Sequence, residues 1–336
     1  MAILLTGGLG FIGSHTAVTL LNAGYEILII DNLSNSKLEV LRKIEDLTKK
    51  RVDFIKTSLS NSSVIEKALV DYNIDSVIHF AGDKSVSESV TDPIGYYNNN
   101  IVESIILLKT LDKCSVKNLI YSSSATVYGI PKKLPICENH PTNPLNPYGR
   151  SKLFMEEIFS DTCRSDKSWN IISLRYFNPV GAHTSGLIGE SPLGIPNNLM
   201  PRIINVALGK EQLLPVYGKD YKTPDGTGIR DYIHVMDLAE AHMSANTFLL
   251  QNPGYEFFNI GTGKGFSVIE LIKFVEIASK KEIKYEFYPR RSGDVSISFA
   301  NPSKANKILN WASKRGIEDM CSSAWNYAKN NVINEE

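Results

Sequence analysis

The sequence predicts an α/β fold in which a doubly wound parallel sheet is followed by a second, smaller α/β lobe. Short apolar and β-branched runs alternate with longer segments of helical periodicity through the first half of the chain. A glycine-rich loop directly follows the first apolar run. From about residue 179 the alternation weakens and Gly, Pro and Asn become frequent, which indicates a change of architecture.

Six runs are predicted as strands of the parallel sheet because they are short, apolar and bounded by turn residues. In chain order they are Ala2–Leu5, Glu26–Ile30, Val52–Lys56, Ser76–Phe80, Asn118–Ser122 and Asn170–Arg175. Helices long enough for right-handed crossovers are expected between them, at Phe11–Ala23, Ser63–Tyr72, Tyr97–Asp112 and Lys152–Cys163.

The composition disfavours several classes of protein. Lys and Arg number 36 and so do Asp and Glu, which leaves no excess positive charge for a nucleic acid. No run of about 18 apolar residues and no basic leader indicates a membrane span or export. The four cysteines are far apart and no histidine pair has ligand spacing, so we expect no disulfide framework, no metal and a cytoplasmic location.

The loop after the first strand has the spacing G-x-x-G-x-x-G, at Gly7, Gly10 and Gly13. These glycines permit a tight turn, close approach to a pyrophosphate and close packing of helix on strand. Asp31 ends the second strand, where a carboxylate accepts hydrogen bonds from both ribose hydroxyls and repels a 2′-phosphate. We therefore predict a Rossmann domain over residues 1–178 that binds NAD rather than NADP. The chain is expected to return to this domain around 230–260.

Tyr148 and Lys152 are one helical turn apart, so their side chains lie on one face. A free tyrosine titrates near ~10, but the Lys152 ammonium and an oxidised nicotinamide ring would lower its pKa toward useful acid–base strength. An ordinary surface Tyr and Lys would show the same spacing. The run Ser122 to Ser124 favours the catalytic interpretation, because it ends the fifth strand at the edge where such sheets bind ligands.

With these motifs the chain resembles the extended short-chain dehydrogenase/reductases. Six separated strings resemble the UDP-galactose 4-epimerases among them: Asp31–Ser36, His79–Val90, Ser122–Gly129, Arg175–His183, Gly194–Pro201 and Asp225–Ala239. The resemblance covers nearly the whole chain. It implies inversion of carbon 4 of a UDP-hexose through a 4-keto sugar, a UDP-sugar-binding lobe over 179–336, and a homodimer formed through the helices at 97–112 and 152–163.

The resemblance also assigns roles to individual positions. The catalytic residues are Ser124, Tyr148 and Lys152. Those that contact NAD are Gly7, Gly10, Phe11, Ile12, Gly13, Asp31, Asn32, Leu33, Ser34, Asn35, Ser36, Ser58, Leu59, Phe80, Ala81, Gly82, Lys84, Asn99, Ser122, Tyr148, Lys152 and Phe177. Those that contact the UDP-sugar are Lys84, Ser124, Tyr148, Asn178, Asn198, Leu199, Tyr217, Arg230, Arg291, Asp294 and Ser298.

Two positions depart from the family pattern. Ser58 stands where the family usually has an aspartate that contacts the adenine amino group; a serine can also form a hydrogen bond there, and a modest loss of cofactor affinity is expected. Ser298 stands where a bacterial subgroup has tyrosine. A small residue there accompanies acceptance of 2-acetamido sugars, so we expect UDP-GlcNAc and UDP-GalNAc as substrates beside UDP-glucose and UDP-galactose.

Two alternatives to a 4-epimerase stay open. A sugar-nucleotide 4,6-dehydratase has the same cofactor domain, but it carries an Asp-Glu pair after the catalytic hydroxyl, where this chain has Ala125 and Thr126. A non-enzymatic NAD-binding sensor typically loses the catalytic tyrosine, whereas Tyr148 is present.

Overall fold

A computed structural model describes residues 1–194, 196–291 and 293–333. Its main sheet has seven parallel strands in the order β10-β6-β5-β4-β1-β2-β3. The strands are β1 (Ala2–Thr6), β2 (Glu26–Asp31), β3 (Asp53–Lys56), β4 (Ile74–His79), β5 (Asn118–Ser124), β6 (Asn170–Tyr176) and β10 (Gly254–Ile260). Because β1 and its neighbours are covered on both faces, they consist of nearly continuous apolar residues. The predicted fold class is confirmed.

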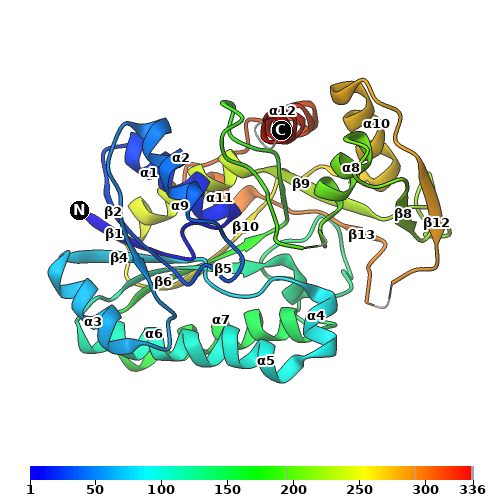
Figure 1. Cartoon of the computed structure of the whole chain (residues 1–336). Helices are drawn as coiled ribbons and strands as arrows, with labels where there is room; N and C mark the ends of the chain where they lie inside the picture. Colours follow the sequence, from blue (N-terminus) through cyan, green and yellow to red (C-terminus); the bar gives the residue numbers. More distant parts are fainter. Residues whose placement is uncertain (195, 292, 334–336) are drawn as a thin grey trace.

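Helices cover both faces of this sheet (Figure 1). On one face lie α1 (Phe11–Asn22), α2 (Glu39–Thr48) and α9 (Val235–Leu249), and on the other α3 (Ser62–Asp71), α6 (Glu103–Lys113) and α7 (Pro147–Ser165). Each face has its own apolar core. The periodicity analysis does not include α2, although Val40, Leu41, Ile44 and Leu47 give this helix an apolar face that packs against the core.

The predicted helix over 97–112 is interrupted in the structure. Short helices α4 (Val86–Thr91) and α5 (Pro93–Tyr97) are followed by a π-helical turn, η1 (Asn98–Val102), before α6 begins. Apolar periodicity does not reveal this wider turn, because its first three residues are asparagines. π-Helical turns occur frequently at functional sites.

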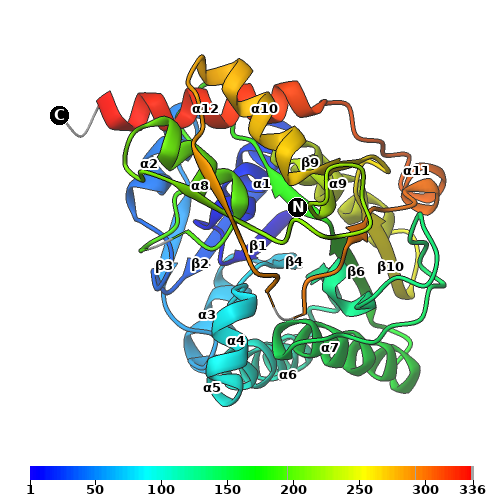
Figure 2. The same ribbon diagram turned by 90° about the vertical axis from the view of Figure 1, so that its right-hand side faces the viewer.

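The second lobe packs around its own core. β9 (Ile229–His234) is its central strand, which pairs with β7 (Asn178–Val180), β11 (Gly265–Ser267) and β13 (Ile297–Ser298). β8 (Leu214–Tyr217) pairs separately with β12 (Tyr285–Tyr288). The helices are α8 (Leu199–Ala207), α10 (Val268–Ser279) and α12 (Ile317–Ile333), and Figure 2 shows α12 passing beside α10.

The chain passes between the two sheets three times, after β6, after β9 and after β10. It leaves the main sheet after β6 and returns with α9 and β10, within the range 230–260 where a return is predicted. β9 lies at the start of that range, but it belongs to the second sheet. α11 (Ser303–Ile308) then packs against the main core before α12 closes the second lobe. The residue boundaries of the two domains stay a prediction.

No helix within the described ranges is both long and apolar enough to cross a membrane. All four cysteines, Cys114, Cys137, Cys163 and Cys321, are free thiols.

Candidate active site

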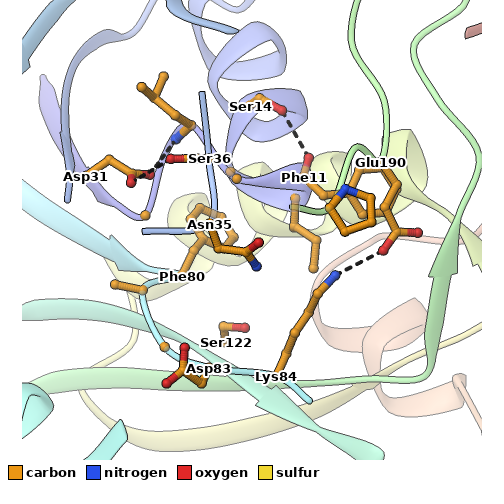
Figure 3. Close-up of a pocket in the computed structure, with 18 of the residues that line it drawn as sticks. Phe11, Ser14, Asp31, Asn35, Ser36, Phe80, Asp83, Lys84, Ser122 and Glu190 are labelled. Carbon is orange, nitrogen blue, oxygen red and sulfur yellow. Dashed lines mark hydrogen bonds and ion pairs between the residues drawn. The ribbon is translucent and has the colours of Figure 1, made fainter. Parts of the chain in front are cut away.

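A cavity of about 720 Å³ lies along the carboxyl ends of the strands of the main sheet. Its walls come from the segments that follow β1 to β6, and residues 187–192 and 198 of the second lobe close it from the other side. Figure 3 shows side chains from these segments converging on it. A volume of this size at this edge of a doubly wound sheet suits a nucleotide ligand.

The glycine loop holds its backbone too close to its neighbours for any side chain. A Cβ atom on Gly7, whose φ is +67°, would lie 2.7 Å from the Ala81 nitrogen, and one on Gly13 would lie 2.6 Å from the Gly7 oxygen. α1 begins directly after Gly10 and has no capping side chain. Its first backbone N–H groups therefore face the cavity, where they suit a pyrophosphate.

Asp31 is almost buried at the end of β2, where its carboxylate accepts three hydrogen bonds from the protein. The Ser36 hydroxyl lies at 2.8 Å (Figure 3), the Leu33 nitrogen at 2.9 Å and the Leu9 nitrogen at 3.1 Å. A carboxylate has about four acceptor positions. Asp31 is thus held in place with acceptor capacity left for a ribose hydroxyl, and these residues fit NAD.

The predicted catalytic residues come together where β5 ends and α7 begins. Asn146 caps α7 by accepting a hydrogen bond from the Gly149 nitrogen at 2.8 Å. A Cβ on Gly149 would lie 3.0 Å from the Thr126 backbone oxygen, so this glycine lets the first turn of α7 approach β5. Tyr148 on that turn hydrogen-bonds to the Ser124 hydroxyl.

Thr126 orients the Ser124 hydroxyl. The Thr126 nitrogen and hydroxyl lie 3.2 and 2.9 Å from the Ser124 oxygen and both donate to it. With two hydrogen bonds accepted, Ser124 has its own proton to donate. Thr126 lies in the 3₁₀ turn η2 (Ala125–Tyr128) that follows β5.

Burial is the main influence on the pKa values of Tyr148 and Lys152. Burial lowers the pKa of Lys152 to about 8, although the carboxylates of Asp83 and Glu156 act to raise it. Burial also raises the pKa of Tyr148, and the hydrogen bond with Ser124 lowers it only in part. The prediction that Lys152 lowers the Tyr148 pKa is therefore not met by the protein alone. The Lys152 nitrogen lies 5.8 Å from the Tyr148 ring centroid and 4.7 Å from that of Tyr121.

The π-helical turn η1 fixes the loop after β4. The Asn100 side chain accepts a hydrogen bond from the Asp83 nitrogen at 2.8 Å and donates to the Asp83 oxygen at 2.9 Å. Asn99, next to it, lines the cavity together with residues 80–84. The turn thus connects the loop after β4 to the helical layer below the sheet.

An ion pair joins the two lobes across the cavity. The Lys84 nitrogen lies 3.0 Å from the Glu190 carboxylate, as Figure 3 shows, and Asn198 donates to the same carboxylate oxygen at 2.5 Å. Lys84 and Asn198 are among the residues that the resemblance assigns to ligands. Their shared partner, Glu190, has no sequence motif that would have predicted it.

The structure divides the predicted site residues into two groups. The cavity is lined by all of the predicted catalytic and cofactor-binding residues except Leu33, which packs against the core, and by Asn178 and Asn198. The other UDP-sugar residues lie outside it on the second lobe: Leu199, Tyr217, Arg230, Arg291, Asp294 and Ser298. The individual roles stay predictions.

The second group is itself held together. Arg291 forms an ion pair with Asp294 at 2.9 Å and lies over the Tyr217 ring at 5.0 Å from its centroid. Arg230 and Ser298 are register partners in β9 and β13. Arginine and aspartate in this arrangement offer contacts for a diphosphate and a ribose.

Sequence reasoning missed several residues of the cavity. Glu103, Glu190, Tyr327 and Asn331 line it, and the last two come from α12, near the end of the chain. Glu103 follows the π-helical turn η1 directly, and its N–H bonds to the Asn98 oxygen, so in the sequence it has the ordinary appearance of a polar residue within a helix. It therefore carried no distinctive signal.

The described residues contain no group of three or more His, Cys, Asp or Glu side chains that could hold a metal ion. His79 is buried and is held by the Thr6 and Ser104 hydroxyls at 2.7 and 2.9 Å. Burial lowers its pKa to about 3, so it is a neutral core residue.

The parallel sheet, the glycine loop with Asp31, and the Ser-Tyr-Lys arrangement define an extended short-chain dehydrogenase/reductase. Residues 4–324 match the family described as GDP-mannose 4,6 dehydratase. The UDP-glucose 4-epimerase of Bacillus subtilis is 50% identical over 99% of this chain and 98% of its own length, and that of Dictyostelium discoideum is 52% identical over 97% and 95%. The chain therefore belongs to the UDP-glucose 4-epimerase family.

A solved structure agrees with this membership. The UDP-glucose 4-epimerase of Bifidobacterium longum, in complex with NAD⁺ and UDP, is 48% identical and covers 99% of each chain with a TM-score of 0.96. The predicted family, enzyme class and NAD cofactor are confirmed.

Proposed function

We propose that this chain interconverts UDP-glucose and UDP-galactose by NAD-dependent inversion at carbon 4. The observation that carries the proposal is the placement of Ser124, Tyr148 and Lys152 in the same cavity as the glycine loop and Asp31. One end of the cavity suits a dinucleotide, and the other presents an acid–base group. NAD bound there supplies reversible acceptance of a hydride from carbon 4 of the sugar.

The residues of the chain perform the proton transfer. Tyr148 takes the proton of the sugar 4-hydroxyl and returns it after the ring has turned, and Ser124 donates its hydrogen to the reacting oxygen. Lys152 is buried near the pair, with its nitrogen 5.8 Å from the Tyr148 ring centroid, and its charge together with that of an oxidised nicotinamide ring would favour the phenolate of Tyr148. The Lys84–Glu190 pair connects the two lobes across the cavity.

A dehydratase reaction is the second candidate, because the matching family is described by that activity. Elimination of water requires an acid beside the catalytic serine. Ala125 and Thr126 occupy those positions, and Thr126 is committed to hydrogen bonds with Ser124. This chain is therefore an epimerase in our proposal.

The test is incubation of the purified full-length chain with NAD and UDP-galactose, with no other oxidant or reductant. We expect UDP-glucose to accumulate until the two sugars reach equilibrium, with a trace of bound NADH in the absorbance spectrum. A 4-keto-6-deoxy product would instead show a dehydratase, and a chain that binds NAD but leaves the sugar unchanged would be a sensor.

We also propose that the chain accepts the 2-acetamido sugars UDP-GlcNAc and UDP-GalNAc. Ser298 is a small side chain beside Arg230 in the second lobe. Phe299, which could have filled the space, packs instead near Gly265, where a Cβ would lie 3.5 Å from the Phe299 ring. Phe299 follows β13 directly, so its ring lies beside β11 and leaves the space at Ser298 open.

Replacing Ser298 with tyrosine should lower kcat/KM for UDP-GlcNAc relative to UDP-glucose by about tenfold or more. Forcing additional atoms into a filled site costs roughly 1–3 kcal/mol, and 1.4 kcal/mol is a factor of ten. Ser322→Tyr on the exposed side of α12 is the matched control and should leave the ratio unchanged. The proposal is wrong if the native chain ignores UDP-GlcNAc or if both variants behave alike.

A homodimer through the helical layer of α5 to α7 is the remaining proposal. Ile94, Val102 and Phe154 on this layer are 81%, 46% and 42% exposed, which leaves apolar side chains on the surface. Sedimentation equilibrium of the purified chain measures the association, and the mass of a single chain at micromolar concentration would contradict it. The cytoplasmic location stays a prediction.

A further inference from the structure

Ser58, which follows β3 and lines the cavity, has used all of its hydrogen-bonding capacity within the protein. Its hydroxyl accepts hydrogen bonds from the Ser60 hydroxyl at 3.0 Å and the Ser60 nitrogen at 3.3 Å. Its own proton is directed at both carboxylate oxygens of Glu103, at 3.0 and 3.1 Å. A hydroxyl has one proton and two acceptor positions, so Ser58 has nothing left to offer a ligand.

Glu103 is in the opposite situation. Its carboxylate lines the same cavity and is partly exposed to it, and among the described contacts Ser58 is its one donor. A carboxylate has about four acceptor positions. Ser58 therefore holds the Glu103 carboxylate in position, and most of the hydrogen-bond acceptor positions of this carboxylate are free.

The position of this pair identifies the part of the cofactor that it meets. The pyrophosphate lies at the start of α1 and the adenosine ribose at Asp31, where β2 ends. β3 is the next strand outward, and Ser58 and Leu59 after it line the cavity together with Ala81 of the loop after β4 and with Glu103. Leu59 and Ala81 supply apolar walls that pack against the core, and the Ser58–Glu103 pair is the polar edge between them. This is a slot for the adenine ring.

We infer that Glu103, oriented by Ser58, is the group that accepts a hydrogen bond from the adenine amino group of NAD. The inference rests on the NAD-dependent function proposed above. It replaces the expectation that Ser58 itself makes this contact, and the loss of cofactor affinity expected from a serine at position 58 does not follow. The carboxylate comes from the first turn of α6 rather than from the loop after β3.

The chemistry of the carboxylate makes the inference specific. An ionised carboxylate only accepts hydrogen bonds, so it favours the amino group at carbon 6 of adenine and repels the carbonyl at carbon 6 of hypoxanthine. If Glu103 served only as a polar residue of the helical layer that holds Ser58, it would not contact the base and would not distinguish the two bases. Discrimination between the bases therefore separates a contact from a structural role.

The experiment compares NAD with its deaminated analogue, nicotinamide hypoxanthine dinucleotide, by titration of the full-length chain freed of nucleotide. We expect the native chain to bind the analogue more weakly, by about tenfold or more. The Glu103 carboxylate then faces the carbonyl of hypoxanthine in place of the amino group of adenine and is left without a donor. Glu103→Gln should reduce the ratio of the two Kd values to within about threefold, since an amide side chain both donates and accepts.

Glu66→Gln is the matched control. Glu66 lies on α3 in the same helical layer, is paired with Lys113 at 2.8 Å and does not line the cavity. Glu66→Gln removes one negative charge, as Glu103→Gln does. We expect the ratio of the Kd values for the two dinucleotides to stay as in the native chain. Equal binding of both dinucleotides by the native chain, or unchanged discrimination in Glu103→Gln, would overturn the inference. A native chain that binds neither dinucleotide would contradict the NAD-dependent function itself.

Discussion

Replacing Tyr148 with phenylalanine is expected to lower kcat for UDP-galactose by about 10²–10⁴-fold, the contribution of a positioned acid–base group. The variant keeps the ring on the first turn of α7 and removes only the hydroxyl that bonds to Ser124. NAD binding should persist, because the glycine loop and Asp31 lie at the other end of the cavity. Steady-state epimerisation, with a separate NAD titration, measures both effects.

Tyr285→Phe is the matched control for this result. Tyr285 lies on β12 of the second lobe and is 40% exposed, so the loss of its hydroxyl should leave kcat unchanged. If Tyr148→Phe retained a rate within tenfold of the native chain, the acid–base role would belong to another group.

The second large effect is expected on stability, at the ion pair beneath the active site. Arg175 on β6 contacts Glu156 on α7 at 2.5 Å, and each side chain is only 4% exposed. Burial opposes the charge of Arg175, but the hydrogen bond and charge of Glu156 outweigh it and raise the pKa of the guanidinium. Ser123 donates to the same carboxylate at 2.5 Å, and Arg175 donates to the Tyr128 hydroxyl at 2.8 Å.

Arg175→Met should lower the free energy of unfolding by about 3–5 kcal/mol, because it leaves the Glu156 carboxylate buried without its cation. Arg164→Met, at the exposed end of α7, removes an ion pair with Asp161 at 3.3 Å in which both side chains are more than three-quarters exposed. That control should cost less than about 1 kcal/mol. Chemical denaturation of both variants measures the difference, and equal stabilities would show that the buried network contributes little.

Most of the main sheet was predictable because its strands are defined locally. Each of the six predicted strands lies within two residues of an observed one, since buried parallel strands are continuous apolar runs. The π-helical turn at 98–102 was not predictable, because its first three residues are asparagines and give no apolar pattern. The sheet to which β9 belongs was also undetermined, because an apolar run does not reveal its partner strand.

The residues of the site also divide into those that the sequence revealed and those that it did not. The glycine loop, Asp31, Tyr148 and Lys152 were found because each requires a fixed spacing along the chain. Glu103 and Glu190 were missed because each acts across a long sequence separation. Glu103 meets Ser58 from another element, and Glu190 meets Lys84 from the other lobe.

The sequence by itself therefore determined the fold class and the cofactor and predicted the pair Tyr148 and Lys152, because these depend on residues that are close along the chain. Only the tertiary structure decided which hydroxyls are already committed and which carboxylates remain free. Ser124 and Ser58 are both strand-end serines, yet Ser124 is left with a proton to donate, whereas Ser58 gives its proton to Glu103. The physical reason is that a hydroxyl has one proton, and the neighbour that receives it is set by packing between distant elements.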